Sequence, residues 1–408
     1  MKRWLGLFGL CLSAAAWAQL PPIEQVTQQL LALPEVQAAD ATLRASEAAA
    51  QRLSVGPHEF TLRVGGQQRR LRDAGSPGVE PQVSVERPVR WPGKAAQDAR
   101  LGEAGQALAR LQRADVLHEV SRALLRDWYA LQRDLALAAL WQQQATSQQA
   151  LVDTSRRRVQ AGDAARSELS SQLAAQAQIE ANRLQAQAQA DAALASWISR
   201  YPLIPAPLVV TATAVPEAAA AQDMAALREH LTNDDHGVRM AQAEAALARA
   251  RAERMTQEQR PDPTLGMHWS REQSGRERLL GVSVSLPLGG AGRAADSRQA
   301  QAEAEALAAR AEQRRRERMA DAAAQTVRAA AAVDTWRAQA QAEAQAQAAL
   351  QAAQKGWSLG EYAVSDVHLA RRQQAEAALA AVTARVDALH QQDRLRLDLH
   401  QLWDLGDD

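Results

Sequence analysis

Four short runs of alternating apolar and polar residues predict β-strands. The runs cover positions 59–64, 79–86, 264–269 and 280–288. In the first of them, Phe60, Leu62 and Val64 alternate with polar neighbours. Alternation places successive side chains on opposite faces of a strand, so the runs predict two β-hairpins, each with one apolar face. The intervening segments 65–78 and 270–278 are polar and contain glycine, as hairpin loops do.

Alternating strands of this kind fit two environments. An ordinary half-buried sheet places its apolar face on a protein core. A membrane barrel turns the same face toward lipid. Four strands are too few to close a barrel around a lumen, so the membrane interpretation requires several copies of the chain.

A different period, of three to four residues, marks long helices. No proline occurs from Lys94 to about position 160. Apolar residues there recur at helical spacing, at Val116, Val120, Leu124, Trp128, Leu131 and Leu135. A helix of this extent would be roughly 100 Å long. The segment from Arg293 to about Trp357 has a similar length. Its Ala/Gln-rich part, 338–354, could be disordered, but its composition favours a helix that packs through small side chains.

Each long helix is expected to end in a turn that starts a returning helix. Gly162 and Gly360 stop the helices, and Ser-Glu at 167–168 or Ser-Asp at 365–366 begins the next ones, a shift of 198 positions (360 − 162). The returning helices are expected over about 166–199 and 365–403. Two further helices are expected over about 25–54 and 223–259, each leading into a hairpin.

The strand-to-helix junction is duplicated. Positions 83–88 and 93–96 recur at 282–287 and 292–295, a shift of 199 (282 − 83), which indicates two copies of one structural unit. The sequence therefore predicts a mainly α-helical protein with a small β part, in which long antiparallel helical hairpins accompany four strands. The expected organisation is a signal peptide at 1–18 followed by two repeats, at 19–220 and 221–408. The first repeat is expected to contain an N-terminal helix, a β-hairpin at about 58–90, a helical hairpin at about 94–200 and a proline-rich segment at about 201–222. The second is expected to contain a helix at about 223–259, a β-hairpin at about 263–289 and a helical hairpin at about 293–403.

The first residues predict secretion. A basic start, an apolar stretch from Leu5 to Ala16 and the Ala16-Trp17-Ala18 cleavage signal describe a signal peptide, with the mature chain beginning at Gln19. The stretch is shorter than the ~20 residues of a spanning helix, which disfavours a membrane anchor. Cys11 is the only cysteine and Leu10 precedes it, so lipidation is not expected, and the mature chain would hold no thiol.

Composition removes several function classes. Forty-seven basic and forty-seven acidic residues balance, which leaves no basic excess for nucleic acid. Aromatic residues make up only 4% of the chain, which disfavours a large conventional core and suits helices packed through alanine. No mature segment is apolar enough for a transmembrane helix, so membrane entry would require a closed barrel.

Catalytic and metal-binding patterns are not expected. The eight histidines are scattered, at positions 58, 118, 230, 236, 268, 368, 390 and 400. His230 and His236, with Asp234 and Asp235 between them, could suggest a metal site, but such a polar cluster before a helix is more often a helix cap. No Ser-His-Asp spacing, phosphate loop or carboxylate pair stands out, so the sequence predicts a protein that is not an enzyme and needs no cofactor.

At this point the chain resembles a known family. Two hairpins, two sets of long helices, the Gly-x4-Ser-(Asp/Glu) turns at Gly162 and Gly360, and the segment 281–288 followed by Gly292-Arg293 are similar to TolC-type outer-membrane efflux factors. The resemblance spans essentially the whole mature chain. The segment 86–94, Glu-Arg-Pro-Val-Arg-Trp-Pro-Gly-Lys, also resembles the junction of the branch that serves heavy-metal efflux pumps, which is a weaker cue.

The resemblance implies an assembly and partners. Family members are homotrimers in which four strands per protomer form a twelve-stranded β-barrel and the helices form an α-barrel through the periplasm. It implies docking to a periplasmic adaptor protein and to an inner-membrane pump of the resistance-nodulation-division type. The chain would then be a passive conduit in the outer membrane of a Gram-negative bacterium, with metal cations as one candidate cargo.

The resemblance also implies roles for particular residues. The adaptor-docking tip turns would contain Arg158, Gly162, Ser167, Glu168, Gly360, Tyr362 and Ser365, and the strand-to-helix junctions would contain Pro88, Gly93, Pro287 and Gly292. Asp366 corresponds to an acidic residue at the tunnel entrance, where three copies would favour cations. Helix capping by Ser365 and Asp366 is an equally supported alternative. Tyr362 and Leu369 depart from the family pattern of a basic and a second acidic residue, so a double acidic gate is not expected.

Two other classes fit parts of the pattern. A periplasmic adaptor would also carry a long helical hairpin, but only one, flanked by β-rich domains. A structural coiled coil would need sustained heptads and has no use for amphipathic β-hairpins. Trp91 and Trp269 lie near the ends of predicted strands, where they fit either an interfacial aromatic belt or simple packing.

Overall fold

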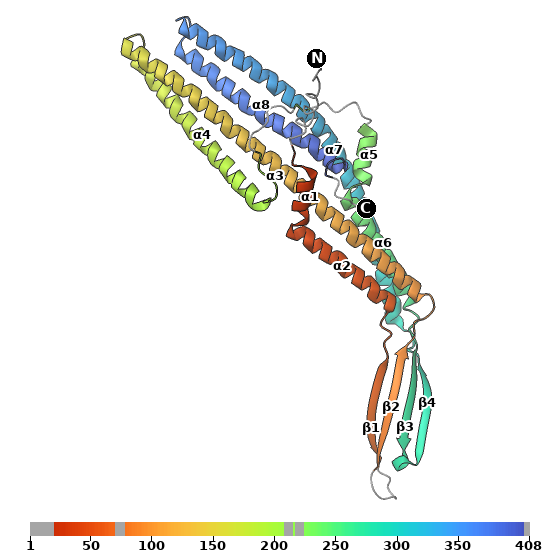
Figure 1. Cartoon of the computed structure of the whole chain (residues 1–408). Helices are drawn as coiled ribbons and strands as arrows, with labels where there is room; N and C mark the ends of the chain where they lie inside the picture. Colours follow the sequence, from red (N-terminus) through yellow and green to blue (C-terminus); the bar gives the residue numbers. More distant parts are fainter. Residues whose placement is uncertain (1–19, 70–77, 208–214, 217–223, 404–408) are drawn as a thin grey trace, which may run out of the picture. The chain divides into compact units, whose positions relative to one another are not determined.

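The computed structural model describes residues 20–69, 78–207, 215–216 and 224–403. The expected signal peptide with Cys11, and part of the proline-rich segment, lie outside these ranges. The described chain consists of long helices and one four-stranded sheet, as the sequence predicts (Figure 1). The elements in order are α1 (Ile23–Leu31), α2 (Pro34–Val55), β1 (Thr61–Arg69), β2 (Gly78–Pro88), α3 (Lys94–Ala161), α4 (Arg166–Arg200), α5 (Met224–Asn233), α6 (His236–Gln257), β3 (Thr264–Glu272), the short 3-10 helix η1 (Gln273–Gly275), β4 (Glu277–Ser285), α7 (Ala291–Ser358) and α8 (Val364–Asp398).

The four strands form a single antiparallel sheet in the order β1-β2-β3-β4. The two predicted hairpins are therefore joined edge to edge through β2 and β3, with Val83 opposite Trp269. Strands β1 and β3 continue five and three residues beyond the predicted ends, to Arg69 and Glu272 (69 − 64 and 272 − 269). Trp269 consequently lies inside β3 rather than at its end. Strand β4 ends at Ser285, three residues earlier than predicted (288 − 285).

The two helical hairpins have equal lengths. Helices α3 and α7 each contain 68 residues, and α4 and α8 each contain 35. The expected bounds of these helices agree with the structure to within a few residues, apart from the end of α8, which lies five residues before position 403 (403 − 398). The repeated spacing in the sequence therefore corresponds to repeated element lengths.

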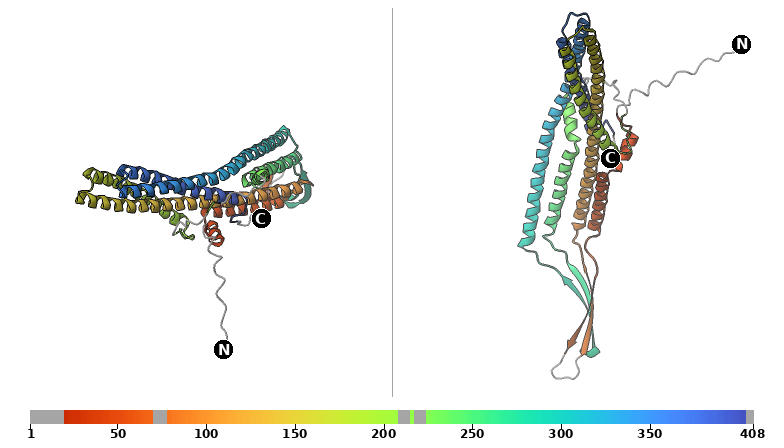
Figure 2. Two further views of the ribbon diagram at one scale, coloured as in Figure 1. Left: turned by 90° about the horizontal axis from the view of Figure 1, so that it is seen from above. Right: turned by 90° about the vertical axis from the view of Figure 1, so that its left-hand side faces the viewer.

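The chain divides into two compact units, and the 68-residue helices α3 and α7 contribute residues to both. The first unit contains residues 1–33, 117–231 and 319–408, and the second contains 34–116 and 232–318. In the first unit α3 packs beside α4, and α7 beside α8 (Figures 1 and 2). Ala138 of α3 meets Ala186 and Ala190 of α4, so small side chains allow close helix packing there.

An apolar and aromatic cluster forms the main core of the first unit. Leu124, Trp128 and Leu131, three members of the predicted helical stripe, are buried in it. The rings of Trp128 and Trp197 lie 5.2 Å apart, and the Trp197 indole donates a hydrogen bond to the Ile204 carbonyl at 3.1 Å. The amphipathic period of α3 is thus confirmed, and Trp128, Tyr129, Trp197, Tyr201 and Trp403 come together in this core.

In the second unit, helices pack mainly through small residues. At Gly102 of α3, a β-carbon would lie only 3.0 Å from the Cβ of Ala50 in α2. Ala245, Ala252, Ala300 and Ala311 are buried on α6 and α7. Glycine at 102 therefore permits a close approach between two helices that any larger side chain would separate.

Two segments expected to be single helices are each broken. The first is divided between α1 and α2, because Pro34 cannot continue α1 but fits the first position of α2. The second is divided between α5 and α6, where Asp235 adopts an extended conformation and its side chain accepts a hydrogen bond from the Val238 amide at 3.0 Å. Asp235 is thus the cap of α6, in agreement with the capping interpretation of the acidic cluster.

Within the described residues, no helix combines the length and the apolar character that crossing a bilayer requires.

Candidate functional site: sheet faces, junctions and helix tips

One face of the sheet is apolar from edge to edge. Strand register places Leu62 beside Val85, Met267 beside Val282, and Leu265 beside Val284 on this face. Its apolar residues are Leu62, Val64, Val79, Pro81, Val83, Val85, Leu265, Met267, Trp269, Leu280, Val282 and Val284, and the polar Gln68, Arg87, Arg271 and Arg278 lie on the same face toward its two ends. Most of these side chains are exposed in the single chain, Val282 to 83%. An uncovered apolar face of this extent indicates that another apolar phase covers it.

The opposite face carries paired charges. Glu80 is only 2% exposed and accepts hydrogen bonds from the Gln67 amide at 3.0 Å and the Gln273 backbone at 2.9 Å. Arg69 pairs with both Glu80 and Glu272, at 3.0 and 2.7 Å. Charges that are paired and hydrogen-bonded can lie in a partly enclosed space that contains water. This face therefore suits contact with water, whereas the other face suits contact with an apolar phase.

The first strand-to-helix junction is held by Trp91 and Lys94. The Trp91 indole donates to the Pro261 carbonyl at 2.6 Å, and its backbone amide donates to Asp262 at 3.1 Å. Lys94, the first residue of α3, is fully buried and lies 2.9 Å from Asp262 and 3.4 Å from Glu258. The junction after β2 is thereby attached to the segment that leads into β3.

The same junction contains further ion pairs. Arg254 pairs with Asp98 and Glu258, Arg293 with Glu258 at 3.3 Å, and His58 with Asp262 at 3.2 Å. Burial alone would raise the pKa values of Glu258 and Asp262, but their basic and amide partners outweigh it and lower both. Both carboxylates are therefore ionised at neutral pH and stabilise the fold in that form.

The predicted junction glycines differ in conformation. Gly93 has a φ of +91°, which favours glycine, and it directly precedes α3. Gly292 lies inside the first turn of α7, because that helix begins at Ala291. Pro88 is the last residue of β2, whereas Pro287 follows the end of β4. The two junctions therefore share a sequence pattern but only the first has the left-handed turn.

The two tip turns, in contrast, are structurally identical. Gly162 and Gly360 have φ values of +82° and +79°. In each turn the glycine amide bonds to the carbonyl three residues back, at 3.1 Å, and the next amide bonds five residues back, at 2.9 Å. This pair of bonds is the Schellman motif, which ends a helix by satisfying its last carbonyls. The two Schellman bonds thus recur with the 198-residue shift, and in the second turn the Tyr362 amide also donates to the Gly356 carbonyl, at 3.4 Å.

The returning helices begin at Arg166 and Val364, close to the expected positions, but neither has a serine as its N-cap. Their N-caps are Ala165 and Ala363, so Ser167 and Ser365 lie within the first turn and are not caps. The exposed Asp366 carboxylate accepts a hydrogen bond from the Ala363 amide at 3.0 Å. Asp366 therefore stabilises the start of α8, and its position at the tip is also compatible with an entrance charge.

Glu168, the counterpart of Asp366, makes different contacts. It lies 3.3 Å from the Ser155 hydroxyl and 3.6 Å from Arg158, whose guanidinium stacks over the Trp357 ring at 4.8 Å. Tyr362 is 52% exposed, and its ring lies against Gly356. Arg158 thus connects the ends of α3, α4 and α7, a role for Arg158 that sequence spacing alone does not indicate.

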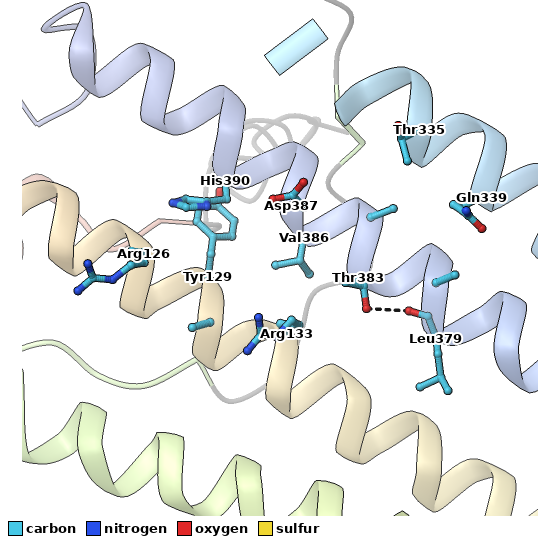
Figure 3. A pocket seen from close by; sticks show the side chains of 13 residues that line it. Arg126, Tyr129, Arg133, Thr335, Gln339, Leu379, Thr383, Val386, Asp387 and His390 are labelled. Carbon is cyan, nitrogen blue, oxygen red and sulfur yellow. Dashed lines mark hydrogen bonds between the residues drawn. The ribbon is translucent and has the colours of Figure 1, made fainter. Parts of the chain in front are cut away.

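A groove between α3, α7 and α8 lies outside the predicted site residues (Figure 3). It has a volume of about 630 Å³. Tyr129 and His390 lie side by side on its wall, with ring centroids 5.5 Å apart. The Tyr129 hydroxyl donates to Asp393, and burial together with this carboxylate raises the pKa of Tyr129. Single polar and apolar residues from three helices line this groove, and no local sequence motif indicates it.

Known proteins resemble this chain in structure but not in sequence. No family model matches the sequence, and no curated protein is significantly similar to it. Solved structures do match: CusC, whose crystal structures concern folding and transmembrane channel formation, superposes with a TM-score of 0.78 at 12% identity over 92% of this chain and 91% of that one. The outer-membrane channel OprN gives 0.75 at 17% identity, covering 94% and 90%. The outer membrane protein VceC of Vibrio cholerae gives 0.70 at 16% identity, covering 94% and 96%.

The chain has the TolC-type fold of these outer-membrane channels. The family resemblance noted from the sequence is confirmed at the level of the fold, over nearly the full length of both chains. A periplasmic adaptor or a simple coiled coil would not superpose in this way, because neither pairs two helical hairpins with a four-stranded sheet. At such low identity, the match follows element order and length rather than particular side chains.

Proposed function

We propose that this chain is the outer-membrane channel of a tripartite efflux system. Three copies would contribute four strands each to a twelve-stranded barrel, and the helices would continue the conduit into the periplasm. The chain would act passively, without catalysis and without a cofactor. The observation that carries the proposal is the sheet, whose apolar face is continuous and uncovered while its opposite face bears paired charges.

Closure of the sheet follows from its edges. Strands β1 and β4 each have an unpaired edge in the single chain, and open edges invite pairing with another copy. In lipid an open edge would leave backbone groups unsatisfied, so a barrel must close. Joining β4 of one copy to β1 of the next completes the hydrogen bonding and presents the apolar face outward.

The partners belong to the proposal as well. We place an adaptor on the tip turns around Gly162 and Gly360, and an inner-membrane pump of the resistance-nodulation-division type behind it. The matching turns at Gly162 and Gly360 provide a repeated surface for an adaptor, and the exposed Tyr362 adds an aromatic side chain to the second of them. The likeness to CusC and the 86–94 segment favour metal cations as cargo. We also propose the two-repeat organisation at 19–220 and 221–408, which the equal helix lengths support.

Membrane fractionation tests the proposal directly. The mature protein is expected in outer-membrane fractions as a trimer that migrates as one species without heating and as a monomer after boiling. A photo-crosslinker at Tyr362 is expected to capture an adaptor, whereas one at Val282 on the apolar sheet face should not. Recovery of the protein as a soluble periplasmic monomer would contradict the channel proposal.

Asp366 is proposed as the entrance charge. The change Asp366→Asn retains an acceptor for the Ala363 amide but removes three charges from a trimer. In planar bilayers, reduced cation preference and weaker block by polyvalent cations are expected, because a carboxylate ring attracts cations in a narrow mouth. Glu376→Gln, about three turns further along α8, is the matched control. Unchanged selectivity together with lower thermal stability would show that Asp366 is only a helix cap.

A further inference from the structure

A buried arginine in α8 lacks a charged partner. Arg371 is only 7% exposed. Among the described residues its single hydrogen bond is from Nη1 to the Gln148 amide oxygen at 3.1 Å, and its buried Nε donates to no acceptor. No carboxylate of the described chain forms an ion pair with it, and burial lowers its pKa. The neighbouring Arg372, by comparison, is exposed and faces Glu376.

The surroundings of Arg371 are polar but neutral. Gln144 donates to Gln374 at 2.9 Å, and Gln148 donates to Gln172 at 2.8 Å. None of these amides carries a negative charge, and among the described residues the buried Nε2 of Gln172 has no hydrogen-bond acceptor, so the positive charge is left uncompensated. A buried charge of this kind is strongly unfavourable unless an anion joins it.

Arg371 lies on the wall of a cavity between α3, α7 and α8. The cavity has a volume of about 450 Å³, which is within the range of small-molecule sites. Gln144, Ser147 and Gln374 line it with hydrogen-bonding groups, and Leu350 and Trp357 supply apolar wall. The site therefore combines one unpaired cation, several neutral donors and an apolar surface, all from the first compact unit.

The duplicated hairpin does not require this arginine. The 198-residue shift of the tip turns makes position 173 the counterpart of 371 (371 − 198), and Leu173 there is 43% exposed. Gln148, the partner of Arg371, corresponds to Ala346 (148 + 198). The charge and its amide partner thus occur once and not in both copies, which separates them from the features that build the hairpin.

We propose that this cavity binds an organic carboxylate, with the carboxylate on the Arg371 guanidinium and the apolar part against Trp357 and Leu350. Arg371 lines the cavity, and its planar guanidinium carries parallel N–H donors that match a carboxylate. The apolar wall selects a carboxylate with an aromatic or aliphatic body over a small inorganic anion. This inference rests on the cavity alone and does not depend on the channel proposal.

Binding of benzoate to the purified full-length protein in detergent tests the inference. Isothermal titration is expected to show saturable benzoate binding, with benzamide, the neutral isostere, at least tenfold weaker. Arg371→Gln should weaken benzoate binding at least tenfold, because it removes the charge and keeps an amide near Gln148. Arg372→Gln removes the same charge from the exposed neighbouring position and should change the affinity less than twofold.

Thermal unfolding without benzoate provides an independent readout. Arg371→Gln should be at least as stable as the wild type, since an uncompensated buried charge is gone. Equal benzoate binding by the wild type and Arg371→Gln, or no binding by the wild type, would overturn the inference. A large loss of stability or of the oligomer in Arg371→Gln would also overturn it, because a carboxylate from another copy would then be the partner.

Discussion

Replacing Val282 with arginine should reduce the amount of protein inserted in the outer membrane at least tenfold. Val282 lies near the middle of β4 on the apolar face of the sheet, and it is the most exposed valine of that face. An arginine facing lipid near the bilayer midplane costs about 2–4 kcal/mol per copy, and a trimer would contain three. The measurement is the heat-modifiable species in outer-membrane fractions, compared with the wild type at equal expression.

The matched control is arginine at the next position of the same strand. Ser283 lies on the opposite face, where it lines a polar groove with Arg63 and His268. Ser283→Arg has the same size and charge change at the same depth but faces water, so near-normal insertion is expected. Equal losses for the two variants would show that the apolar face does not contact lipid.

Lys94→Met should lower the free energy of unfolding by about 3 kcal/mol. The change leaves Asp262 and Glu258 without the buried ammonium between them, and breaking a buried ion pair costs about 3–5 kcal/mol. The lower end is expected because Asp262 keeps His58 and Glu258 keeps arginine partners. Lys355→Met, on an exposed part of α7, is the control and should change stability by less than about 0.5 kcal/mol.

The pH dependence of this difference provides a second check. The pKa values of Asp262 and Glu258 are lowered in the folded protein, so the unfolded chain binds protons first as the pH falls. Their stabilising contribution is complete above the unfolded values, near about pH 4, and is lost as the pH falls through the folded values. The stability gap between wild type and Lys94→Met should therefore narrow below about pH 4. A stability difference that does not change with pH would show that Lys94 stabilises the fold through packing and not through its charge.

Local patterns predicted most of the fold because they report directly on local geometry. Period-two alternation identified all four strands, and the Val116 to Leu135 stripe identified the buried side of α3. Gly162 and Gly360 were predictable because a left-handed residue is what a Schellman turn requires. Repetition of the pattern gave the equal lengths of the hairpins without any knowledge of their packing.

The remaining features depend on tertiary contacts that no local pattern encodes. Pairing of β2 with β3 joins the two predicted hairpins, which are far apart in the sequence. In the sequence Lys94 looks like an ordinary lysine in the first turn of a helix. Its burial between Asp262 and Glu258 depends on tertiary contacts. The pairs Ser-Glu at 167–168 and Ser-Asp at 365–366 were expected to begin the returning helices, yet the N-caps lie two residues before each serine, at Ala165 and Ala363. The preference for polar residues at the N-cap is a weak guide to the first residue of a helix when the preceding turn already determines where the helix begins.

Equal helix lengths also limit how such a chain can change over generations. Helices α3 and α7 match at 68 residues, and α4 and α8 at 35, although few of their side chains coincide. Deleting seven residues from one long helix would shorten it by about 10 Å. Insertions and deletions in one hairpin would therefore need a compensating event in the other, whereas many exposed helix positions would tolerate substitution. The number of residues in each helix would then be preserved more strictly than their identities. Insertions and deletions in an alignment of related sequences should therefore occur in pairs about 198 residues apart.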